Sequence, residues 1–466
     1  MTDTHDLVVV GAGPAGLAAA TTGASLGLRT VLLDEQPRVG GQIWRDVTRA
    51  GPRATALLGP DYARGRPLAE AALASGAEVA SDALVWDVAR DLAVTALQRG
   101  AARRVRAPQL VVATGALERP TPVPGWTLPG VMNAGAAQIA LKTGGLVPGG
   151  PVVLAGGGPL LLLVACQLLD AGVALAGLVE TSPASNRADA LRRLPGALAV
   201  PSMLAKGLRM IARVRRAGVP RFAGATALRV LGDDRATGLG FEAGGRAHRL
   251  HADTVLLHHG VVPNVQIPRL LRVDHRWSDA RLAWEVVVDA FGATSLPGLR
   301  VAGDGAAIAG AAAAEAAGTL AALGAARALG RLDEAALARL AAAPSRALDA
   351  QRRVRPFLDA LYRPPRWVLE PDDATVVCRC EAVTAGRVRE MARLGCRGPN
   401  QTKFYSRCGM GPCQGRVCGG VVTQVLAREL GLPPAEVGAY RVRAPIKPVP
   451  LGALAGLDEG GGDAAG

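Results

Sequence analysis

Six of the seven cysteines of this 466-residue chain lie in its last quarter, where the sequence offers most for metal or redox chemistry. The first pair, Cys378 and Cys380, is separated by one arginine. Cys408 and Cys413 follow after 27 residues and enclose Gly-Met-Gly-Pro, and Cys418 comes after four more. A Cys-x-Cys pair and a Cys-x4-Cys pair can together place four thiolates around one soft metal centre.

The metal that this spacing favours is iron in a 2Fe-2S cluster, with zinc and metal-free thiols as the alternatives. Structural zinc usually lies between two Cys-x2-Cys turns, so a Cys-x-Cys pair is unusual for it. The glycine-rich turn at residues 409–412 leaves backbone amides free to bond sulfur and to tune a redox potential. Cys396 falls on an expected helix–loop stretch and is expected to be a bystander. We predict the ligand set Cys378, Cys380, Cys408 and Cys413, with Cys418 as the alternative to Cys408, because the glycine-rich connection from Cys408 to Cys413 makes the tighter wrap.

The charge of the chain is strongly positive, with a formal net charge of +14 and a pI of about 10.3. The arginines are spread along the chain rather than gathered in one stripe, so we expect no nucleic-acid partner. A positive face that docks a more acidic protein partner is the alternative interpretation.

Nothing near residue 1 resembles a secretory signal, because an apolar run from Leu7 turns at once into a glycine fingerprint. The apolar stretch at 152–169 contains Gly-Gly-Gly-Pro, which favours a buried strand, turn and helix over a membrane span. Clustered cysteines without a secretion signal favour a metal over disulfides. The expectation is a cytoplasmic protein, at most associated with the inner face of the membrane, and not an integral membrane protein.

A nucleotide-binding fingerprint opens the chain. An expected strand at 6–10 leads to Gly11-Ala-Gly13-Pro-Ala-Gly16 and an alanine-rich helix, and a second strand ends at Asp34, 18 residues beyond Gly16. The three glycines suit a tight turn, the approach of a pyrophosphate and close helix–strand packing, while the aspartate can accept hydrogen bonds from a ribose. This arrangement predicts a site for the ADP part of a nucleotide.

Further motifs resemble the two-dinucleotide-fold flavoproteins related to glutathione reductase. They are the loop at 34–43, Ala-Thr-Gly at 113–115 and Val-Ala-Gly-Asp-Gly at 301–305, and the resemblance spans about residues 5 to 330. It implies FAD, with Asp304 near the ribityl–pyrophosphate region; ATP or ADP in place of FAD is the alternative. The disulfide reductases of that family carry a cysteine pair just after the position of Gly41, which this chain lacks, so dithiol exchange is excluded. The predicted cofactor-binding residues are Gly11, Gly13, Pro14, Ala15, Gly16, Asp34, Glu35, Gln36, Gly41, Gln42, Ile43, Ala113, Thr114, Gly115, Gly303 and Asp304.

A second nucleotide-like unit begins at Val152. Its loop has glycines at positions 156 and 158, but Leu161 stands where the last glycine belongs, and Glu180 could bind a ribose. We expect a degenerate NAD-type site, so hydride exchange with nicotinamide is doubtful. His258 and His259 are neighbours in an expected strand and point to opposite faces, so they are not expected to bind one metal. A structural role is favoured, with one histidine lining the flavin pocket as the alternative. Lys142 and Glu315 lack support as catalytic residues, and no catalytic residue is predicted.

These units define an α/β protein with two Rossmann-like dinucleotide-binding domains of the glutathione-reductase type, the second inserted in the first, and a small helical 2Fe-2S domain at the C-terminal side. The predicted limits are 1–120 and 290–330 for the FAD-binding domain, 121–289 for the second domain, 331–370 for a helical connector, 371–440 for the 2Fe-2S domain and 441–466 for a tail.

The cysteine region resembles the bacterioferritin-associated-ferredoxin-like 2Fe-2S domain, and the whole chain resembles the A-type (alpha) subunits of heteromeric opine oxidases, D-hydroxyproline and proline dehydrogenases and hydrogen cyanide synthase. The segments at 34–43, 128–132 and 158–163 are similar to signatures of that family. The resemblance implies a partner beta subunit of the D-amino-acid-oxidase-like flavoprotein type, which oxidises the amine, an FMN at a subunit interface, and electron transfer through this chain to an acceptor such as a quinone or a carrier. Two alternatives remain at this stage: a stand-alone NAD(P)H-dependent ferredoxin-type reductase, and a structural subunit that binds ATP or ADP.

Overall fold

The fold begins with a parallel sheet built from residues far apart in the sequence. The computed structural model describes residues 3–456. The sheet holds five strands in the order β21 (Leu299–Val301), β8 (Gln109–Val112), β2 (Leu7–Val10), β3 (Thr30–Leu33) and β4 (Glu78–Ala80). All neighbouring pairs are parallel, and the central strands are apolar and fully buried because both faces of the sheet are covered.

Helices cover one face of this sheet and a smaller antiparallel sheet covers the other. The helical layer contains α1 (Pro14–Ser25), α4 (Gly65–Ala74) and α11 (Ala311–Ala328), with the short α2 (Pro52–Leu58) and α3 (Pro60–Ala63) beside them. The antiparallel layer contains β5 (Ala83–Val88), β6 (Val94–Gln98) and β7 (Ala101–Arg106), with β1 (Asp3–Thr4) at its edge. This three-layer body is the first nucleotide unit.

The second nucleotide unit repeats the plan. Its parallel sheet runs β10 (Val131–Asn133), β17 (Thr254–His258), β11 (Val152–Gly156), β12 (Leu175–Glu180) and β13 (Arg221–Ala223). The helices α5 (Ala134–Gly144), α6 (Pro159–Asp170) and α9 (Pro201–Arg216) pack against one face. The antiparallel strands β14 (Thr226–Leu231), β15 (Gly238–Ala243) and β16 (Arg246–His251) pack against the other.

The second unit is inserted in the first, because its strands lie in sequence between β8 and β21, which pair directly. Two short strands, β9 (Ala116–Glu118) and β18 (Val261–Pro263), pair antiparallel where the chain passes from one unit to the other. Next come α10 (Gln266–Leu270) and a hairpin of β19 (His275–Ser278) and β20 (Ala283–Val286). The predicted insertion therefore matches the strand order.

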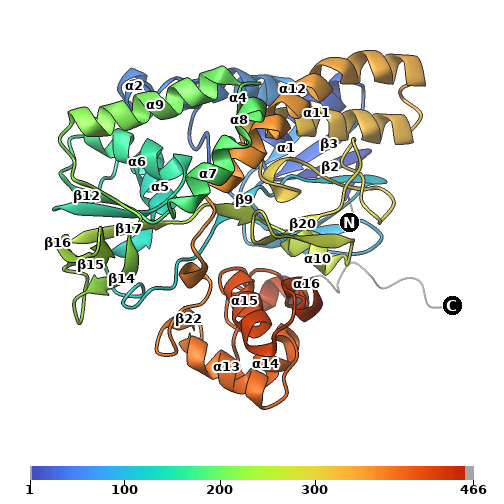
Figure 1. The fold of residues 1–466 in the computed structure, drawn as a ribbon. Helices are drawn as coiled ribbons and strands as arrows, with labels where there is room; N and C mark the ends of the chain where they lie inside the picture. The colour runs from blue at the N-terminus through green and yellow to red at the C-terminus, as the bar shows by residue number, and fades with distance from the viewer. Residues whose placement is uncertain (1–2, 457–466) are drawn as a thin grey trace.

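A long helix connects the nucleotide units to the cysteine module. Helix α12 (Glu334–Leu361) packs along α11 of the first unit and against α7 (Ser185–Leu191) and α8 (Leu194–Ala197) of the second. The module follows as a separate body below both units (Figure 1). It contains β22 (Val376–Cys378), β23 (Val383–Thr384), α13 (Ala385–Arg393), α14 (Pro399–Ser406), α15 (Gly419–Leu430) and α16 (Pro434–Val437).

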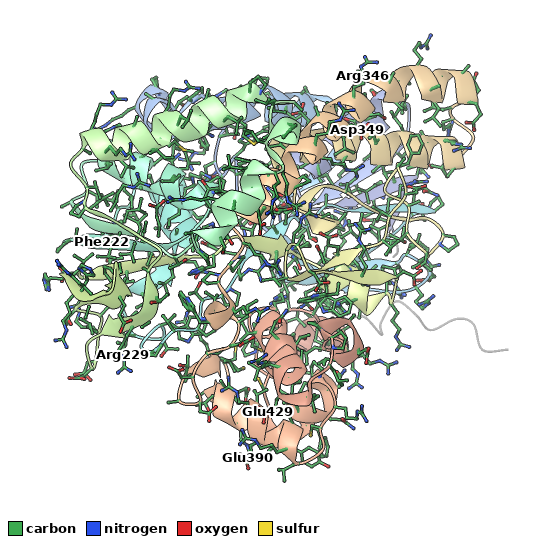
Figure 2. All side chains as sticks on the ribbon, in the orientation of Figure 1. Phe222, Arg229, Arg346, Asp349, Glu390 and Glu429 are labelled. Carbon is green, nitrogen blue, oxygen red and sulfur yellow. The ribbon has the colours of Figure 1, made fainter. Side chains whose placement is uncertain are left out.

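A hydrogen bond ties this module to the second unit, and charge pairs lie within its outer end. Trp126 of the second unit donates from its indole Nε1 to the carbonyl of Val376, 2.7 Å away. At the end away from the nucleotide units, where Figure 2 labels Glu390 and Glu429, each carboxylate is paired with an arginine of α13.

The segment predicted to be a tail, 441–466, is not free over its first part. Val442 and Ile446 are buried in the core of the first unit, and the amide of Ile446 donates to the carbonyl of Trp86. The apolar side chains at these two positions explain the correction, because they bury surface that the antiparallel layer would otherwise expose. Helix α17 (Leu451–Ala455) follows, and residues 457–466 of the predicted tail lie outside the described residues. Among residues 3–456, no helix has the length and apolarity needed to cross a bilayer.

Candidate functional site

The first glycine loop links the end of β2 to the start of α1. Gly11 has φ +104, and a β-carbon there would lie 2.5 Å from the carbonyl oxygen of Ala113. A β-carbon on Gly16 would lie 1.7 Å from the carbonyl oxygen of Gly11, so only glycine permits this helix to approach the strand. Gly13 precedes α1 without a side-chain cap, which leaves the first amides of the helix available for an anion such as a pyrophosphate.

Asp34 lies at the end of β3 beside this loop. Its carboxylate accepts hydrogen bonds from the amide of Ala12 at 2.5 Å and from the amide of Gln36 at 2.8 Å. Burial raises the pKa of Asp34, and the two amides oppose that rise. Glu35, its neighbour, pairs with Lys447 from the returning C-terminal segment. The Asp34 carboxylate thus lies where the hydroxyls of a ribose bound at this loop could reach it.

A second loop, which contains Gly40 and Gly41, packs onto the first. The amide of Gly40 donates to the carbonyl of Ala12, and a β-carbon on Gly41 would lie 2.7 Å from the α-carbon of Gly13. Lys142 of α5 reaches this loop and donates from Nζ to the carbonyl of Gln42, 3.0 Å away. Burial lowers the pKa of Lys142 to about 7, and the charge of Arg45 adds to the effect.

The remaining predicted residues of the first site come from β8 and β21. Gly115 follows β8 and lies against Gly305, while Gly303 lies against Ala15 of α1. The Asp304 carboxylate accepts hydrogen bonds from the amides of Ala309 and Gly310 at 2.8 and 2.9 Å. All the predicted cofactor-binding segments therefore meet at the carboxyl edge of the first sheet, where doubly wound sheets bind their ligands. The uncapped helix, the close backbone packing that the glycines permit and the carboxylates together fit a dinucleotide.

The second glycine loop is filled by side chains of this chain. A β-carbon on Gly158 would lie 3.1 Å from Nε2 of His258, and one on Gly157 would lie 2.8 Å from Oγ of Ser182 and 3.9 Å from the ring of Tyr362. Tyr362 comes from the end of α12, and burial and the charge of Glu180 raise its pKa.

Glu180, the acid expected to bind a ribose here, accepts a hydrogen bond at 2.7 Å from Arg221. Its carboxylate is therefore already paired. The degenerate second site stays a prediction, and these neighbouring side chains and the paired acid are the features that bear on it.

His258 and His259 have separate partners. His258 Nδ1 lies 2.5 Å from the Glu118 carboxylate, whose other oxygen accepts from the amide of Gly135. His259 is buried between the hydroxyls of Thr121 and Thr181, and burial lowers its pKa to about 3. The two rings do not share a site.

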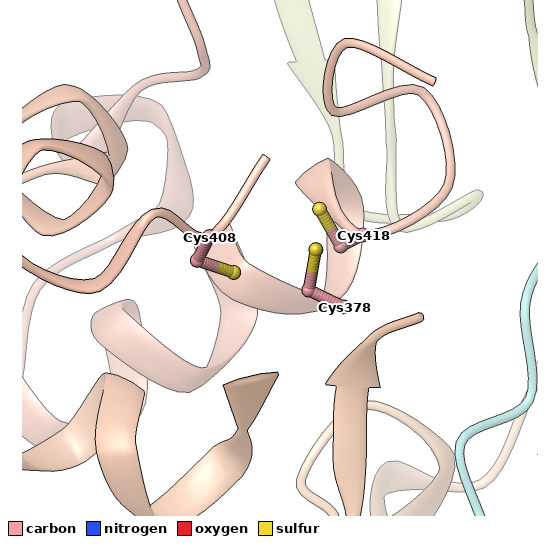
Figure 3. A group of neighbouring side chains, drawn as sticks. All are labelled: Cys378, Cys408 and Cys418. Carbon is pink, nitrogen blue, oxygen red and sulfur yellow. The ribbon is translucent and has the colours of Figure 1, made fainter. Parts of the chain in front are cut away.

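Three buried cysteines form the core of the cysteine cluster (Figure 3). The sulfurs of Cys378, Cys408 and Cys418 all lie within 4.8 Å of one another. Cys378 ends β22, Cys408 follows α14, and Cys418 immediately precedes α15. Sulfur–sulfur hydrogen bonds lower the pKa of Cys378 and raise the pKa values of Cys408 and Cys418. The amide of Gly409 donates to Cys378 Sγ at 3.5 Å.

Cys380 and Cys413 form a second group beside the first. Burial is the largest cause that raises the pKa of Cys380, and the side-chain hydrogen bond with Cys413 and the charge of Cys378 add to the rise. Cys380 is exposed and Cys413 is half-buried, whereas the first three are buried. Of the four predicted ligands, Cys378 and Cys408 lie in the first group and Cys380 and Cys413 in the second. Cys418, predicted as the alternative to Cys408, lies in the first group. Cys396 is buried elsewhere in the module and does not belong to the three-sulfur group.

Tyr440 covers the cluster and is a residue that the sequence motifs do not include. β-Carbons on Gly409, Gly415 and Gly419 would all lie within 3.3 Å of its ring, so the ring packs directly against the backbone of these three glycines. Burial, followed by the charges of Cys418 and Cys408, raises its pKa well above the usual value. No local sequence pattern identifies this tyrosine, because α15 and α16 separate it in sequence from the cysteines that it contacts.

The donor set of the cluster fits a soft metal. The sulfurs of Cys378, Cys408 and Cys418 form a group without histidine or carboxylate in the described part of the chain, while the predicted ligands Cys380 and Cys413 lie outside this group. Thiolates select zinc or iron–sulfur clusters over hard cations. The residues therefore fit a 2Fe-2S cluster, and zinc remains compatible with them.

Comparisons with known proteins agree with this division into two parts. The model of the pyridine nucleotide-disulphide oxidoreductase family matches residues 5–336, and that of the sarcosine oxidase A3 domain matches residues 373–457. The A-type subunit of opine oxidase from Agrobacterium tumefaciens is 45% identical over 98% of this chain and 92% of its own length. Hydrogen cyanide synthase subunit HcnB from Pseudomonas aeruginosa is 33% identical over 97% of this chain and 98% of its own. The crystal structure of L-proline dehydrogenase from P. horikoshii has a TM-score of 0.70 and 19% identity, over 97% of this chain and 80% of that one, and shares the fold.

Proposed function

This chain belongs to the family of oxidoreductase subunits that includes the A-type subunit of opine oxidase, and from that premise we propose that it is the electron-transfer subunit of a heteromeric amine dehydrogenase or oxidase. In this role it takes electrons from a partner subunit that oxidises the carbon–nitrogen bond of an imino acid, an opine or a glycine-type amine. It then passes them to an acceptor, either a quinone or a carrier.

The proposed cofactors are FAD and a 2Fe-2S cluster. FAD, which exchanges electrons singly or in pairs, would be held at the first glycine loop, with Gly11, Gly13 and Gly16 giving access to the pyrophosphate and Asp34 facing the ribose. ATP would fit the same residues, because they mainly contact the ADP half. An FMN at the interface with the partner subunit is a further proposed cofactor.

The observation that carries this proposal is a group of three buried thiols, with Cys380 and Cys413 beside it, in a module joined to a nucleotide unit without a redox cysteine pair. The only cysteine outside the module, Cys166, lies in α6 of the second unit and not beside Gly41. Electrons at the first site therefore have no dithiol to reduce.

The stand-alone nicotinamide-dependent reductase is disfavoured by the second glycine loop. Tyr362 and His258 lie against its glycines, and Glu180 is paired with Arg221. A nicotinamide dinucleotide would have to displace both side chains and break that pair.

The proposed partner is a beta subunit of the D-amino-acid-oxidase-like flavoprotein type, which holds the amine. We propose a cytoplasmic complex, which would meet the inner face of the membrane where its acceptor is a quinone. The net charge of +14 suits docking of more acidic partners.

The test is co-expression with a beta subunit of the proposed type, followed by anaerobic titration with imino acids and opines. Visible and electron paramagnetic resonance spectra should show a reduced 2Fe-2S signal with at least one amine. The Cys380→Ser variant should lose this signal, while the matched control Cys396→Ser, a buried cysteine of the same module, should keep it. Reduction of the isolated chain by NADH without a partner would refute the proposal, as would the absence of a signal with every amine.

The ligand set is tested by serine variants and iron counting. Cys408 and Cys418 both lie close to Cys378 as members of one group, so either can supply the fourth thiolate. We expect at least one of the single variants Cys408→Ser and Cys418→Ser to keep both irons and the double variant to lose them. Retention of both irons by the double variant would remove both cysteines from the ligand set.

A further inference from the structure

Two neighbouring aromatic side chains are exposed on the surface of the cysteine module. Phe404 and Tyr405, at the end of α14, are 74% and 64% exposed and pack edge to face with their ring centres 5.0 Å apart. Met410, which follows this helix, is also exposed. In Figure 1, α14 lies at the lower end of the module, away from both nucleotide units. Single apolar residues are normal on a surface, but large ones that lie together indicate an interaction site.

A groove of about 340 Å³ lies beside these side chains. Its lining consists of Asn400, Lys403, Phe404, Met410, Arg441 and Arg443. Half of these residues are cations, and no aspartate or glutamate of residues 3–456 lines the groove. The surface therefore combines an apolar centre with a positive rim.

The cations of this rim repel one another. The charge of Arg443 adds to burial in lowering the pKa of Lys403, and no carboxylate of the described residues opposes them. Carboxylates brought by a partner would relieve this repulsion, because opposite charges attract across an interface. The charge of the groove thus favours an acidic partner over a neutral or basic one.

The groove lies close to the thiols. Met410 directly precedes Gly411, where a β-carbon would lie 3.3 Å from the sulfur of the exposed Cys380. Lys403 Nζ lies 5.8 Å from the centre of the Tyr440 ring, which covers the cluster. One loop and one ring therefore separate a molecule held in the groove from the sulfurs.

We propose that this groove and the two aromatic rings dock a small acidic protein that carries one electron. The inference rests on the proposed function, which supplies the electron, and names the acceptor as a carrier protein. One electron would leave the reduced cluster and reduce the carrier, while no proton moves and no bond forms or breaks. Weak redox complexes bury less than about 1,200 Å², which suits a small patch, whereas permanent subunit interfaces are larger and more apolar.

A second copy of this chain fits the groove poorly. A two-fold contact places the same patch on both copies, so the rim of one copy would face the equally positive rim of the other. The unpaired cations of both would then repel across the contact.

The first test is calorimetric titration of the full chain with zinc-substituted plastocyanin. Plastocyanin is a small acidic carrier with an apolar face, and its zinc form accepts no electron, so binding is measured without electron transfer. We expect saturable binding that weakens as the ionic strength rises. The dissociation constant should rise about 10-fold in Phe404→Ser, and about 10-fold in the double variant Lys403→Gln, Arg443→Gln.

The matched controls lie on α9 of the second unit. Leu208→Ser removes a leucine that is 68% exposed, and the double variant Arg209→Gln, Arg216→Gln removes the same net charge as the groove variant. Both controls should stay within about twofold of the parent dissociation constant. Absence of saturable binding, unchanged binding in Phe404→Ser, or equal weakening in the α9 controls would overturn the proposal.

The second test is stopped-flow electron transfer from the chemically reduced, reconstituted chain. Oxidised copper plastocyanin and oxidised cytochrome c, a basic carrier, serve as acceptors. Transfer to plastocyanin should slow with rising salt and about 10-fold in Lys403→Gln, Arg443→Gln, whereas transfer to cytochrome c should slow with neither. The same salt dependence with both carriers would contradict the proposal. Binding of zinc plastocyanin without electron transfer to its copper form would count against the proposed function and leave the docking surface standing, so the two can fail separately.

Other occupants of the surface give different results with Phe404→Ser. The readouts are sedimentation of the complex with the beta subunit, self-association of the chain, and binding to phosphatidylglycerol vesicles. Loss of any of these with unchanged plastocyanin binding would assign the surface to that occupant and overturn the proposal. The expected result is weaker plastocyanin binding and no change in the other three.

Discussion

Gly411 is the residue at which a single added methyl group should empty the metal site without dismantling the fold. It lies in the turn between Cys408 and Cys413. A β-carbon at Gly411 would lie 2.2 Å from the β-carbon of Cys380 and 3.3 Å from its sulfur. Gly411→Ala therefore pushes on a predicted ligand from a distance that no two non-bonded carbon atoms tolerate.

The magnitude follows from these distances. Ordinary contact begins at 3.4 Å, so Cys380 and the turn must separate by about 1.2 Å from their 2.2 Å approach. Metal–ligand distances tolerate a change of only about 0.2 Å. Overpacking of this kind costs about 1–3 kcal/mol, which a module with its own apolar core can absorb. The expected result is a folded chain whose iron content falls well below half of the parent value.

The assay is iron and sulfide analysis after anaerobic reconstitution, with circular dichroism as the check on folding. The matched control is Gly420→Ala, in the same module, where an added β-carbon meets nothing within 4 Å. It should keep both irons. If Gly411→Ala also keeps both irons and an unchanged spectrum, Cys380 does not bind the metal and the reasoning is refuted.

Three further predictions concern the nucleotide units. Gly16→Ala should abolish retention of FAD and destabilise the chain, because its β-carbon would lie 1.7 Å from the carbonyl oxygen of Gly11; bound flavin after gel filtration is the measurement. The free energy of unfolding should fall by about 1.4 kcal/mol for each pH unit from 6.5 down towards 3, because His259 is protonated in the unfolded chain but not in the folded chain, where its pKa is about 3. Urea titrations at several pH values should show a shallower dependence of this free energy on pH in His259→Asn. NADH should not bleach the flavin of the parent chain, nor of Tyr362→Ala, because Glu180 stays paired with Arg221 when the ring is removed; rapid NADH-dependent bleaching of either would contradict the closed second site.

The first nucleotide site can be predicted from the sequence because its residues lie in short, separate motifs. Gly11, Gly13 and Gly16 lie within six residues, and the strand before them and the helix after them are set by short apolar and alanine-rich runs. The more distant segments at 113–115 and 303–304 carry their own short motifs. Parallel strands bring such motifs together at one edge of the sheet, so each can be recognised alone.

The other features of the two sites depend on contacts between segments that contain no recognisable sequence motif. Tyr440 and Tyr362 each pack against a site whose other residues belong to a different segment, so neither is part of that site's motif. The choice between Cys408 and Cys418 cannot be made from spacing, because both lie five positions from Cys413 and both reach Cys378. Val442 and Ile446 fall in the segment predicted to be a tail, because only the folded first unit offers them a place to be buried.

The uneven burial of the five thiols gives the proposed electron path a direction. Cys378, Cys408 and Cys418 are buried beside Tyr440, whereas Cys380 is exposed and Cys413 is half-buried. On the proposed function, an acceptor that docks on the module would meet the exposed end of the cluster first. The low-dielectric surroundings at the buried end strengthen any charge placed there, so a charged substitution beside Cys408 should change the potential of the cluster more than the same change beside Cys380.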